Sequence, residues 1–226
     1  MNDIEIIDFH SHIIPTVDHG STSLDVSVEQ VEFALKYGVN TIIATPHFYP
    51  HTHNIDLFLE ERNKMFNLLK KELNDKGIGI NIRCGAEVLL YTGLEKTEKL
   101  NELCVEGTRT LLIELPFSEF LNEYILTLDE IISLGYKVVL AHAERYPIEI
   151  IEQIIPLGVV LQLNADCVSN LFICPHIMSW IKNGLVVGIG SDIHMLDKSA
   201  YVKYGKAKKR LRKYFYGIMK KSKQLI

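Results

Sequence analysis

The sequence predicts an α/β fold in which parallel strands close into a barrel. Three observations lead to this fold. Seven β-branched apolar runs alternate with helical segments, the runs are apolar on both faces, and almost every run ends in a polar group. Strands that are apolar on both faces are typical of a parallel sheet covered by helices. An open sheet gathers its ligands at one switch point, whereas a barrel brings every strand end to one mouth.

The alternation of the two kinds of segment sets the expected element order. The predicted strands are Ile4–Phe9, Asn40–Thr45, Ile80–Ala86, Leu111–Leu115, Val138–Ala141, Val159–Leu163 and Val186–Gly190. The predicted helices lie near 24–37, 56–75, 118–134, 148–156, 175–183 and 200–221, with a weaker helical stretch at 92–107. No repeat or Pro/Gly-rich linker separates them, so we expect one domain over residues 1–226.

Composition favours a globular protein that does not span a membrane. Of the 226 residues, 47% are apolar and 23% are charged, which is ordinary for a soluble domain. The longest apolar runs are too short for a transmembrane helix. The N-terminus has neither a basic region nor an apolar stretch of signal length. We therefore expect a cytoplasmic protein.

The cysteines exclude two classes of site. No pair of cysteines has the C-x-x-C spacing of a structural zinc site. A cysteine-phosphatase loop needs Cys, five residues and then Arg, and Cys104 with Arg109 is one residue short of that spacing. We therefore expect the four cysteines to be ordinary, mostly buried side chains.

Basic residues are concentrated in the C-terminal segment 198–226, which we expect to be helical. It contains eleven Lys or Arg and no Asp or Glu, so the rest of the chain is acidic. Such a segment is suited to an anionic membrane surface, nucleic acid or an acidic partner. The alternative, which we favour, is a helix that packs on the acidic body with its basic face in water.

Histidine and carboxylate side chains recur at the ends of the predicted strands. These candidate ligands are His10, His12, His47, Glu87, Glu114, His142, Asp192 and His194. Imidazole and carboxylate together bind borderline divalent metals such as Zn²⁺, Mn²⁺ and Fe²⁺. Side chains alternate along a strand, so His10 and His12 share one face and are able to bind one ion. Chance or structural histidines are the alternative.

The sequence context of Glu114 and of Arg145 indicates what each contributes to the expected site. Glu114 lies in an apolar context, and an unpaired buried carboxylate is costly without a partner or a metal. Arg145 follows His142 by three residues and is suited to clamp an anionic substrate oxygen. The alternative for Arg145 is a salt bridge to Glu144 or another neighbour. We expect His51, His53 and His176 not to be ligands.

Eight stretches of the chain, which span residues 5 to about 197, carry a resemblance to a known family. They are Ile7-Asp8-Phe9-His10-Ser11-His12-Ile13-Ile14-Pro15, Asp18-His19-Gly20, Ile42-Ile43-Ala44-Thr45-Pro46-His47, Gly85-Ala86-Glu87, Leu112-Ile113-Glu114-Leu115-Pro116, His142-Ala143-Glu144-Arg145-Tyr146, Leu161-Gln162-Leu163-Asn164-Ala165 and Gly190-Ser191-Asp192-Ile193-His194. As a set they resemble the polymerase-and-histidinol-phosphatase superfamily. Within it, the chain resembles the bacterial metal-dependent protein-tyrosine phosphatases of capsule and exopolysaccharide operons. The resemblance implies a distorted seven-stranded barrel.

The resemblance also implies three divalent metal ions, which we expect to be Mn²⁺, with Zn²⁺ or iron as alternatives. The implied ligands of the three ions are, in turn, His10, His12, Glu87 and Asp192; Glu87, Glu114 and His142; and His19, His47 and His194. In this set Glu87 bridges the first two ions. The implied catalytic groups are Arg145, Glu114 and His142.

Two positions depart from the pattern of the phosphatase branch. Asp18-His19-Gly20 stands where the branch usually has Asp-Asp-Gly, although histidine is common there elsewhere in the superfamily. Ser199 stands where the branch tends to carry an Arg, with Lys198 beside it as a candidate substitute. The second departure removes one expected phosphate contact.

The activity implied by the resemblance is hydrolysis of phosphotyrosine on the Tyr-rich tail of a membrane-associated tyrosine autokinase. Small-molecule phosphatase activity, for example on histidinol phosphate, is one alternative. The others are a nuclease or proofreading module and a non-catalytic regulator that binds a phosphorylated tail. The acidic body argues against a nucleic-acid partner. The sequence leaves the oligomeric state open.

Overall fold

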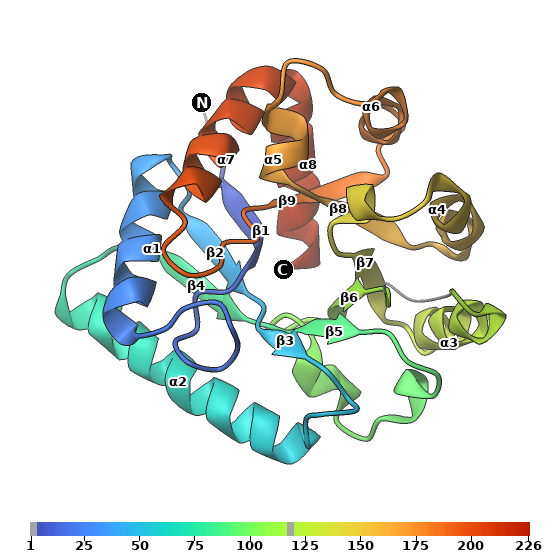
Figure 1. The fold of residues 1–226 in the computed structure, drawn as a ribbon, viewed down its shortest axis with the longest axis horizontal. Coiled ribbons are helices and arrows are strands. Elements are labelled where there is room, and N and C mark those ends of the chain that lie inside the picture. The colour runs from blue at the N-terminus through green and yellow to red at the C-terminus, as the bar shows by residue number, and fades with distance from the viewer. Residues whose placement is uncertain (1–3, 117–119) are drawn as a thin grey trace.

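Parallel strands form the centre of the molecule, and helices surround them (Figure 1). The computed structural model describes residues 4–116 and 120–226. The strands in these ranges are β1 (Ile7–Ser11), β2 (Thr41–Ala44), β3 (His47–Phe48), β4 (Asn81–Cys84), β5 (Glu87–Leu89), β6 (Thr110–Glu114), β7 (Lys137–Leu140), β8 (Val160–Asn164) and β9 (Val186–Gly190). They form a sheet of order β1-β2-β4 and a sheet of order β3-β5-β6-β7-β8-β9. All pairings between them are parallel.

The helices follow the strands in regular alternation. The α-helices in the described ranges are α1 (Leu24–Lys36), α2 (Ile55–Asp75), α3 (Asn122–Ser133), α4 (Ile148–Ile154), α5 (Ala165–Ser169), α6 (Pro175–Lys182), α7 (Lys198–Leu211) and α8 (Lys213–Leu225). Short 3₁₀ helices are η1 (Leu94–Lys96), η2 (Leu100–Leu103), η3 (Ala143–Arg145) and η4 (Ile155–Leu157). Side-chain caps fix where the first two helices begin: Ser23 caps α1 and Asn54 caps α2.

The predicted α/β class with parallel strands is confirmed, but the strand count differs. Each of the seven predicted runs contains a strand, and β3 and β5 lie just beyond two of them. Pro46 separates β2 from β3, because proline has no amide hydrogen to donate to a ladder. Gly85 and Ala86 separate β4 from β5. The part of the chain that the structure describes therefore has nine short strands in two sheets, where the sequence predicted seven strands in one barrel.

The helices differ from the prediction in four places. The helix predicted for 200–221 is two helices, because Arg212 adopts a left-handed φ of 47° between α7 and α8. The stretch 92–107 forms only η1 and η2. The helix predicted for 118–134 begins at Asn122, and its positions 118–119 lie outside the described residues. The short helix α5 was not predicted.

The first strand lies beside the backbone that follows the last strand. Asp192 N donates to His10 O at 2.9 Å, and His12 N donates to Ile193 O at 3.2 Å. Asp8 reinforces this junction from a fully buried position, because Ser191 N and Tyr201 Oη both donate to its carboxylate at 2.8 Å. Burial nevertheless raises the pKa of Asp8 to about 6.

The basic C-terminal segment packs against the body of the protein. Helix α7 buries one face, which includes Tyr201, Tyr204 and Ala207, and α8 buries Phe215 and Ile218. The charged side chains of these helices lie mostly on the opposite, exposed faces. Among the described residues, no helix combines the length and apolar character that crossing a bilayer requires.

Gly188 in β9 allows the Phe9 ring of β1 to pack directly on the backbone. A Cβ at position 188 would lie 2.8 Å from Phe9 Cγ. We expect Gly188→Ala to lower the free energy of unfolding by about 1–3 kcal/mol, because the buried ring has no free space to move into. Denaturant unfolding with a fluorescence readout measures this loss.

Gly79→Ala is the matched control, because a Cβ at position 79 would meet no atom within 4 Å. We expect this variant to unfold at the wild-type denaturant concentration. Equal stability of Gly188→Ala and the wild type would contradict the close packing of β1 on β9.

Candidate metal centre

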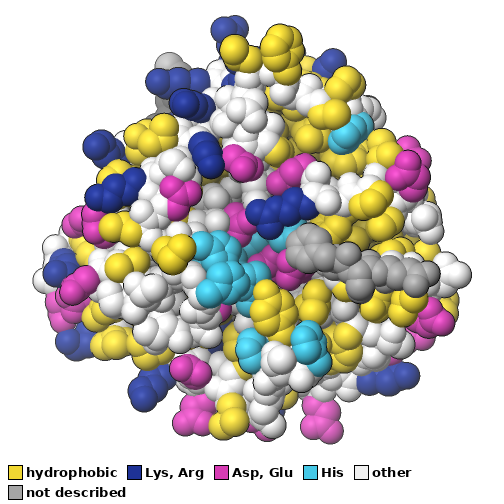
Figure 2. Space-filling view, viewed as in Figure 1, with side chains coloured by type: hydrophobic (Ala, Val, Ile, Leu, Met, Phe, Trp, Pro, Cys, Tyr) yellow, Lys and Arg dark blue, Asp and Glu magenta, His cyan; other side chains and the backbone are white. Residues whose placement is uncertain are grey.

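Histidine and carboxylate side chains converge at the carboxyl ends of the strands. In Figure 2 they gather in a hollow near the middle of the face viewed. The structure brings together all nine predicted ligands: His10, His12, His19, His47, Glu87, Glu114, His142, Asp192 and His194. Parallel strands place their carboxyl ends at one edge, which explains why residues far apart in the sequence meet here.

Glu87 lies at the centre of this cluster and is fully buried. Its Oε2 lies 3.2 Å from His10 Nε2 and 2.9 Å from His47 Nδ1. Its Oε1 lies 2.8 Å from His142 Nε2. The carboxylate of Glu114 lies near two of these three rings, with Oε1 3.5 Å from His142 Nε2 and Oε2 3.9 Å from His47 Nδ1. One carboxylate therefore contacts imidazoles from three separate strand ends.

A second group forms around His10 and His12, whose Nε2 atoms are 3.0 Å apart. Asp192 Oδ1 lies 3.6 Å from His10 Nε2 and 3.3 Å from His12 Nε2. Glu87 Oε2 lies within 3.4 Å of both nitrogens. As predicted from the period of a strand, the two histidines point the same way.

Four imidazole rings form a stack that runs from the exposed His19 to the fully buried His12. His19 lies over His47 with ring centroids 4.8 Å apart, and over His194 at 4.5 Å. His194 also stacks on His12 at 4.0 Å. Ligand atoms of His12, His47 and His194 lie within 4.8 Å of one another, so these three form a tighter group than the predicted set with His19.

Three side chains that were not among the predicted ligands or catalytic groups position the ligands. Asp18 Oδ2 accepts from His12 Nδ1 at 2.7 Å and from the His47 amide at 3.0 Å. Gln162 Oε1 accepts the His142 amide at 2.7 Å and lies 3.2 Å from His10 Nδ1. The amide of Gln162 is held in turn by Asn164 at 3.0 Å. Outer hydrogen bonds of this kind fix the tautomer and orientation of a metal-binding histidine.

The electrostatics of the cluster favour ionised carboxylates. Burial alone would raise the pKa of Glu87, but the charge of His10 and the close approach of the His10 and His12 rings hold that pKa well below its usual value. Burial lowers the pKa of His142, whereas hydrogen bonds to Glu114 and Glu87 raise it, to about 9 on balance. The carboxylates therefore draw protons onto neighbouring imidazoles, as expected where buried negative charge needs compensation.

Not every histidine in the cluster has a raised pKa. Burial and the charge of His12 lower the pKa of His194 to about 4. His194 is therefore neutral near pH 7, which is the form that binds a metal. Its Nδ1 lies 3.0 Å from the Asp192 carbonyl oxygen, which directs Nε2 toward the cluster as a free ligand atom.

Two site residues have an uncommon backbone conformation. His142 has a φ of 34° and Asp192 a φ of 49°, both in the left-handed region. Side chains other than glycine rarely occupy this region, and strain of this kind is concentrated at functional sites. The surrounding hydrogen bonds to Gln162 and His10 keep both residues in place.

Arg145 lies at the mouth of the cluster with 45% of its side chain exposed. Its guanidinium contacts Asp192 Oδ2 at 2.6 Å, so its partner is Asp192 and not Glu144. Tyr49 is half-buried, and its ring stacks on His47 with centroids 5.0 Å apart. The mouth therefore offers one cation and one aromatic face.

The donor set passes a direct test for metal ions. Among the described residues, His47 Nδ1, Glu87 Oε2, His142 Nδ1 and His194 Nε2 are buried without a hydrogen-bond partner. His47 Nδ1 and Glu87 Oε2 are only 2.9 Å apart, yet they are not aligned as donor and acceptor. Buried polar groups are rarely left unpaired, so a cation shared between these atoms fits the geometry.

Three groups of side chains in the described ranges have the spacing of a metal site. They are His10, His12 and Asp192; His47, Glu87 and Glu114; and His12, His47 and His194. Glu87 also adjoins the first group, and His142 adjoins the second. The chemistry of each group, imidazole with carboxylate or imidazole alone, suits Mn²⁺, Fe²⁺ and Zn²⁺.

The remaining histidines lie outside this cluster. His53 Nδ1 accepts from the Tyr49 amide at 3.1 Å, and His51 lies near the Tyr49 ring. His176 contacts Cys174 Sγ at 3.1 Å and Trp180, on α6. Within the described ranges, none of these three histidines belongs to a group with the spacing of a metal site.

Comparisons with known proteins identify the family. A family model described as "Capsular polysaccharide synthesis, CpsB/CapC" matches residues 6–220. The chain is 30% identical over 213 residues to the tyrosine-protein phosphatase CpsB of Streptococcus pneumoniae, covering 85% of this chain and 84% of that protein. It is 29% identical over 203 residues to the tyrosine-protein phosphatase YwqE of Bacillus subtilis, covering 84% and 77%.

A solved structure has the same fold. It comes from a crystallographic study of YwqE from Bacillus subtilis and CpsB from Streptococcus pneumoniae, which are described there as unique metal-dependent tyrosine phosphatases. The TM-score is 0.82 at 23% identity, with 97% of this chain and 94% of that chain covered. The family match extends over nearly the whole chain and includes the ligand-bearing strand ends. The protein therefore belongs to the CpsB/CapC family of capsular polysaccharide synthesis.

Proposed function

We propose that this protein is a metal-dependent tyrosine-protein phosphatase. The observation that carries the proposal is the cluster of buried imidazoles and carboxylates with unpaired ligand atoms, which opens beside an arginine and an aromatic ring. The names of the relatives, CpsB and YwqE, support the same activity. A phosphomonoester hydrolase needs positive charge for phosphate oxygens and an activated water, and this site is suited to both.

The ligands proposed for three divalent ions are the nine clustered residues. Their grouping is His10, His12, Glu87 and Asp192; Glu87, Glu114 and His142; and His47, His194 and His19, with His12 adjoining the third group. We propose Mn²⁺, with Zn²⁺ or iron as alternatives, because the set mixes imidazole and carboxylate. Bound ions of this kind would lower the pKa of a water molecule and compensate charge on phosphate oxygens.

The protein's own residues orient the substrate. Arg145 presents planar donors at the mouth and is suited to hold a non-bridging phosphate oxygen. Asp192 keeps the guanidinium in place through its 2.6 Å contact. Lys198, the candidate substitute for the arginine missing at Ser199, pairs with Glu29 at 2.7 Å. Glu114 and His142 line the same centre and complete the proposed catalytic set.

The leaving group and the mouth are both consistent with an aryl phosphate. A tyrosine phenolate leaves readily, because its conjugate acid has a pKa near ~10. A strong general acid is therefore less necessary than for an alkyl phosphate. Tyr49 offers an aromatic face beside His47, where the ring of a phosphotyrosine can stack.

The proposed physiological substrate is the phosphorylated Tyr-rich tail of a membrane-associated tyrosine autokinase in capsule synthesis. A cytoplasmic location follows from that partner.

We also propose that the two sheets together form one distorted seven-stranded barrel in a single domain. This is supported by the hydrogen bonds that join β1 to the backbone after β9.

The first test is turnover of a phosphotyrosine peptide by metal-stripped protein with and without added Mn²⁺. We expect hydrolysis only with metal, and a loss of at least about 100-fold in His10→Ala, because that variant removes a proposed ligand. His176→Ala is the matched control and should retain wild-type turnover, since His176 lies on α6 outside the cluster. Metal-loaded protein without turnover would contradict the proposal, and faster turnover of histidinol phosphate would assign a small-molecule phosphatase.

Asp18→Asn tests the positioning of His12. The amide side chain accepts the His12 Nδ1 hydrogen bond less strongly and does not balance its charge. We expect Mn²⁺ affinity, measured by titration calorimetry, to fall about 10–100-fold while the fold is retained. Asp166→Asn is the control, because Asp166 is exposed after β8 and should leave the affinity unchanged. Unchanged affinity in Asp18→Asn would exclude this role.

Arg145→Lys tests the phosphate contact. Lysine keeps the charge but lacks the planar pair of donors, so we expect kcat/KM for the phosphotyrosine peptide to fall about 10–100-fold. Arg83→Lys is the control, because Arg83 lies on β4 and its guanidinium donates to Glu106 O at 3.4 Å. Wild-type kinetics in Arg145→Lys would show that the guanidinium does not hold the substrate.

A further inference from the structure

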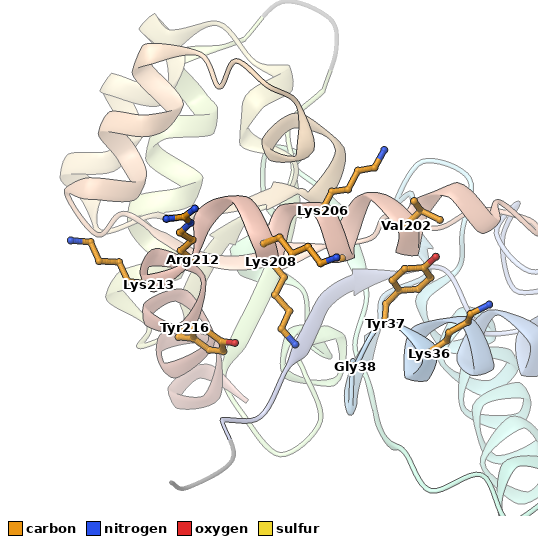
Figure 3. A pocket seen from close by; sticks show the side chains of 11 residues that line it. Lys36, Tyr37, Gly38, Val202, Lys206, Lys208, Arg212, Lys213 and Tyr216 are labelled. Carbon is orange, nitrogen blue, oxygen red and sulfur yellow. The ribbon is translucent and has the colours of Figure 1, made fainter.

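The surface around the α7–α8 junction combines clustered cations with exposed apolar side chains. A groove with a volume of about 980 Å³ runs along α7 and is bounded by the end of α1. Figure 3 shows Lys36 and Tyr37 at one end of this groove, and Arg212, Lys213 and Tyr216 at the other. None of the described residues that line this groove is acidic.

A second groove, of about 900 Å³, adjoins the first. It shares Lys206, Lys209 and Arg212 with the first groove and adds Leu171 and Phe172 from the loop between α5 and α6. We call the two grooves together the basic edge. Because three cations line both grooves, the basic edge is one continuous surface.

Leu171 and Phe172 form an apolar tip on this edge. Leu171 is 77% exposed and Phe172 is 92% exposed, the largest value among the exposed large apolar side chains of the described residues. Arg210 of α7 donates to the Leu171 carbonyl, so the tip is held next to the basic helix. Two adjacent apolar side chains at this exposure have a cost in water unless another surface covers them.

The cations of the basic edge are not used to balance acidic side chains. Within the described ranges, Lys198 pairs with Glu29 and Lys223 pairs with Glu5, both away from the two grooves. None of the described carboxylates lies within ion-pair distance of Lys206, Lys209 or Arg212. The basic edge therefore keeps its positive charge available for an outside partner.

The junction itself places these groups on one surface. Arg212 has a φ of 47° and a ψ of −116°, which ends α7 and turns the chain into α8. A continuous helix would carry Arg212 and Lys213 along the axis of α7. The turn instead brings both cations to the groove lined by Lys208 and Tyr216. Strain in a backbone that positions exposed charge is typical of a functional surface.

We propose that the basic edge docks the protein on an anionic membrane surface, with Leu171 and Phe172 inserted among the lipid headgroups. Clustered Lys and Arg beside exposed Leu and Phe are the composition of an interfacial membrane contact, in which cations meet anionic lipid and apolar side chains enter the boundary. An acidic protein segment would satisfy the cations, but it would leave the apolar tip in water.

The basic edge is separate from the metal centre, so docking leaves the centre accessible. The α7–α8 turn lies at the top of Figure 1, whereas the strand ends that carry the ligands lie near the middle of the view. Docking of the basic edge does not depend on the proposed phosphatase activity, because it uses the charge and exposed side chains of a different surface. Docking would bring the protein to the membrane on which a membrane-associated substrate resides.

The test is cosedimentation of the full-length protein with vesicles of phosphatidylcholine alone or mixed with phosphatidylglycerol. We expect binding only to the mixed vesicles and a steady loss as salt increases, because salt screens the contact. We expect Lys206→Glu/Lys209→Glu to weaken binding about tenfold or more, and Phe172→Ser to weaken it severalfold. Thermal melting confirms that each variant is folded.

Matched controls carry the same chemical changes on a distant helix. Lys64→Glu/Lys70→Glu changes two exposed lysines of α2, and Leu57→Ser removes an exposed leucine of α2. Both controls should bind vesicles like the wild type. Equal binding to neutral and mixed vesicles, or an equal loss in the α2 lysine variant, would overturn the proposal. Capture of an acidic peptide by the basic edge without vesicle binding would overturn it as well.

Discussion

The site depends on the burial of Glu87, a carboxylate with no solvent contact and imidazoles from three strand ends around it. Burial of an unpaired carboxylate costs several kcal/mol, so the fold is stable only if positive charge is supplied at this point. The raised pKa of His142 is the response of the protein alone, and the proposed divalent ions would supply that charge more completely. The stability of the fold and the proposed chemistry therefore both require positive charge beside Glu87.

Much of the fold and the site follows from local sequence patterns. The pair His10 and His12 is predictable because strand side chains alternate, and its place at a strand end follows from the apolar run before it. Asp18 and Gln162 were missed as positioning residues because their partners are ring nitrogens and amides brought to them by the tertiary fold. No periodicity in a single chain carries that information.

The differences between the predicted and observed elements have one local and one tertiary cause. Pro46 lies just beyond the strand predicted for Asn40–Thr45 and separates β2 from β3, because proline has no amide hydrogen to donate to a ladder. The left-handed turn at Arg212 was not predicted, because no glycine or asparagine stands at that position. Tertiary packing of α7 and α8 decides the conformation of that turn, and the intrinsic preference of the backbone at Arg212 does not decide it.

The hydrogen bonds of Asp8 have a consequence for how the protein is made. They join position 8 to Ser191 and Tyr201, so almost the whole chain lies between the partners. Contacts at such separation form late, because a long loop must close before they contribute any free energy. During synthesis on the ribosome, His10 and His12 are made early, and the last of the residues that surround them are made only after nearly all of the later strands. A nascent or truncated chain therefore carries an incomplete set of ligands, and full assembly of the centre marks completion of the fold.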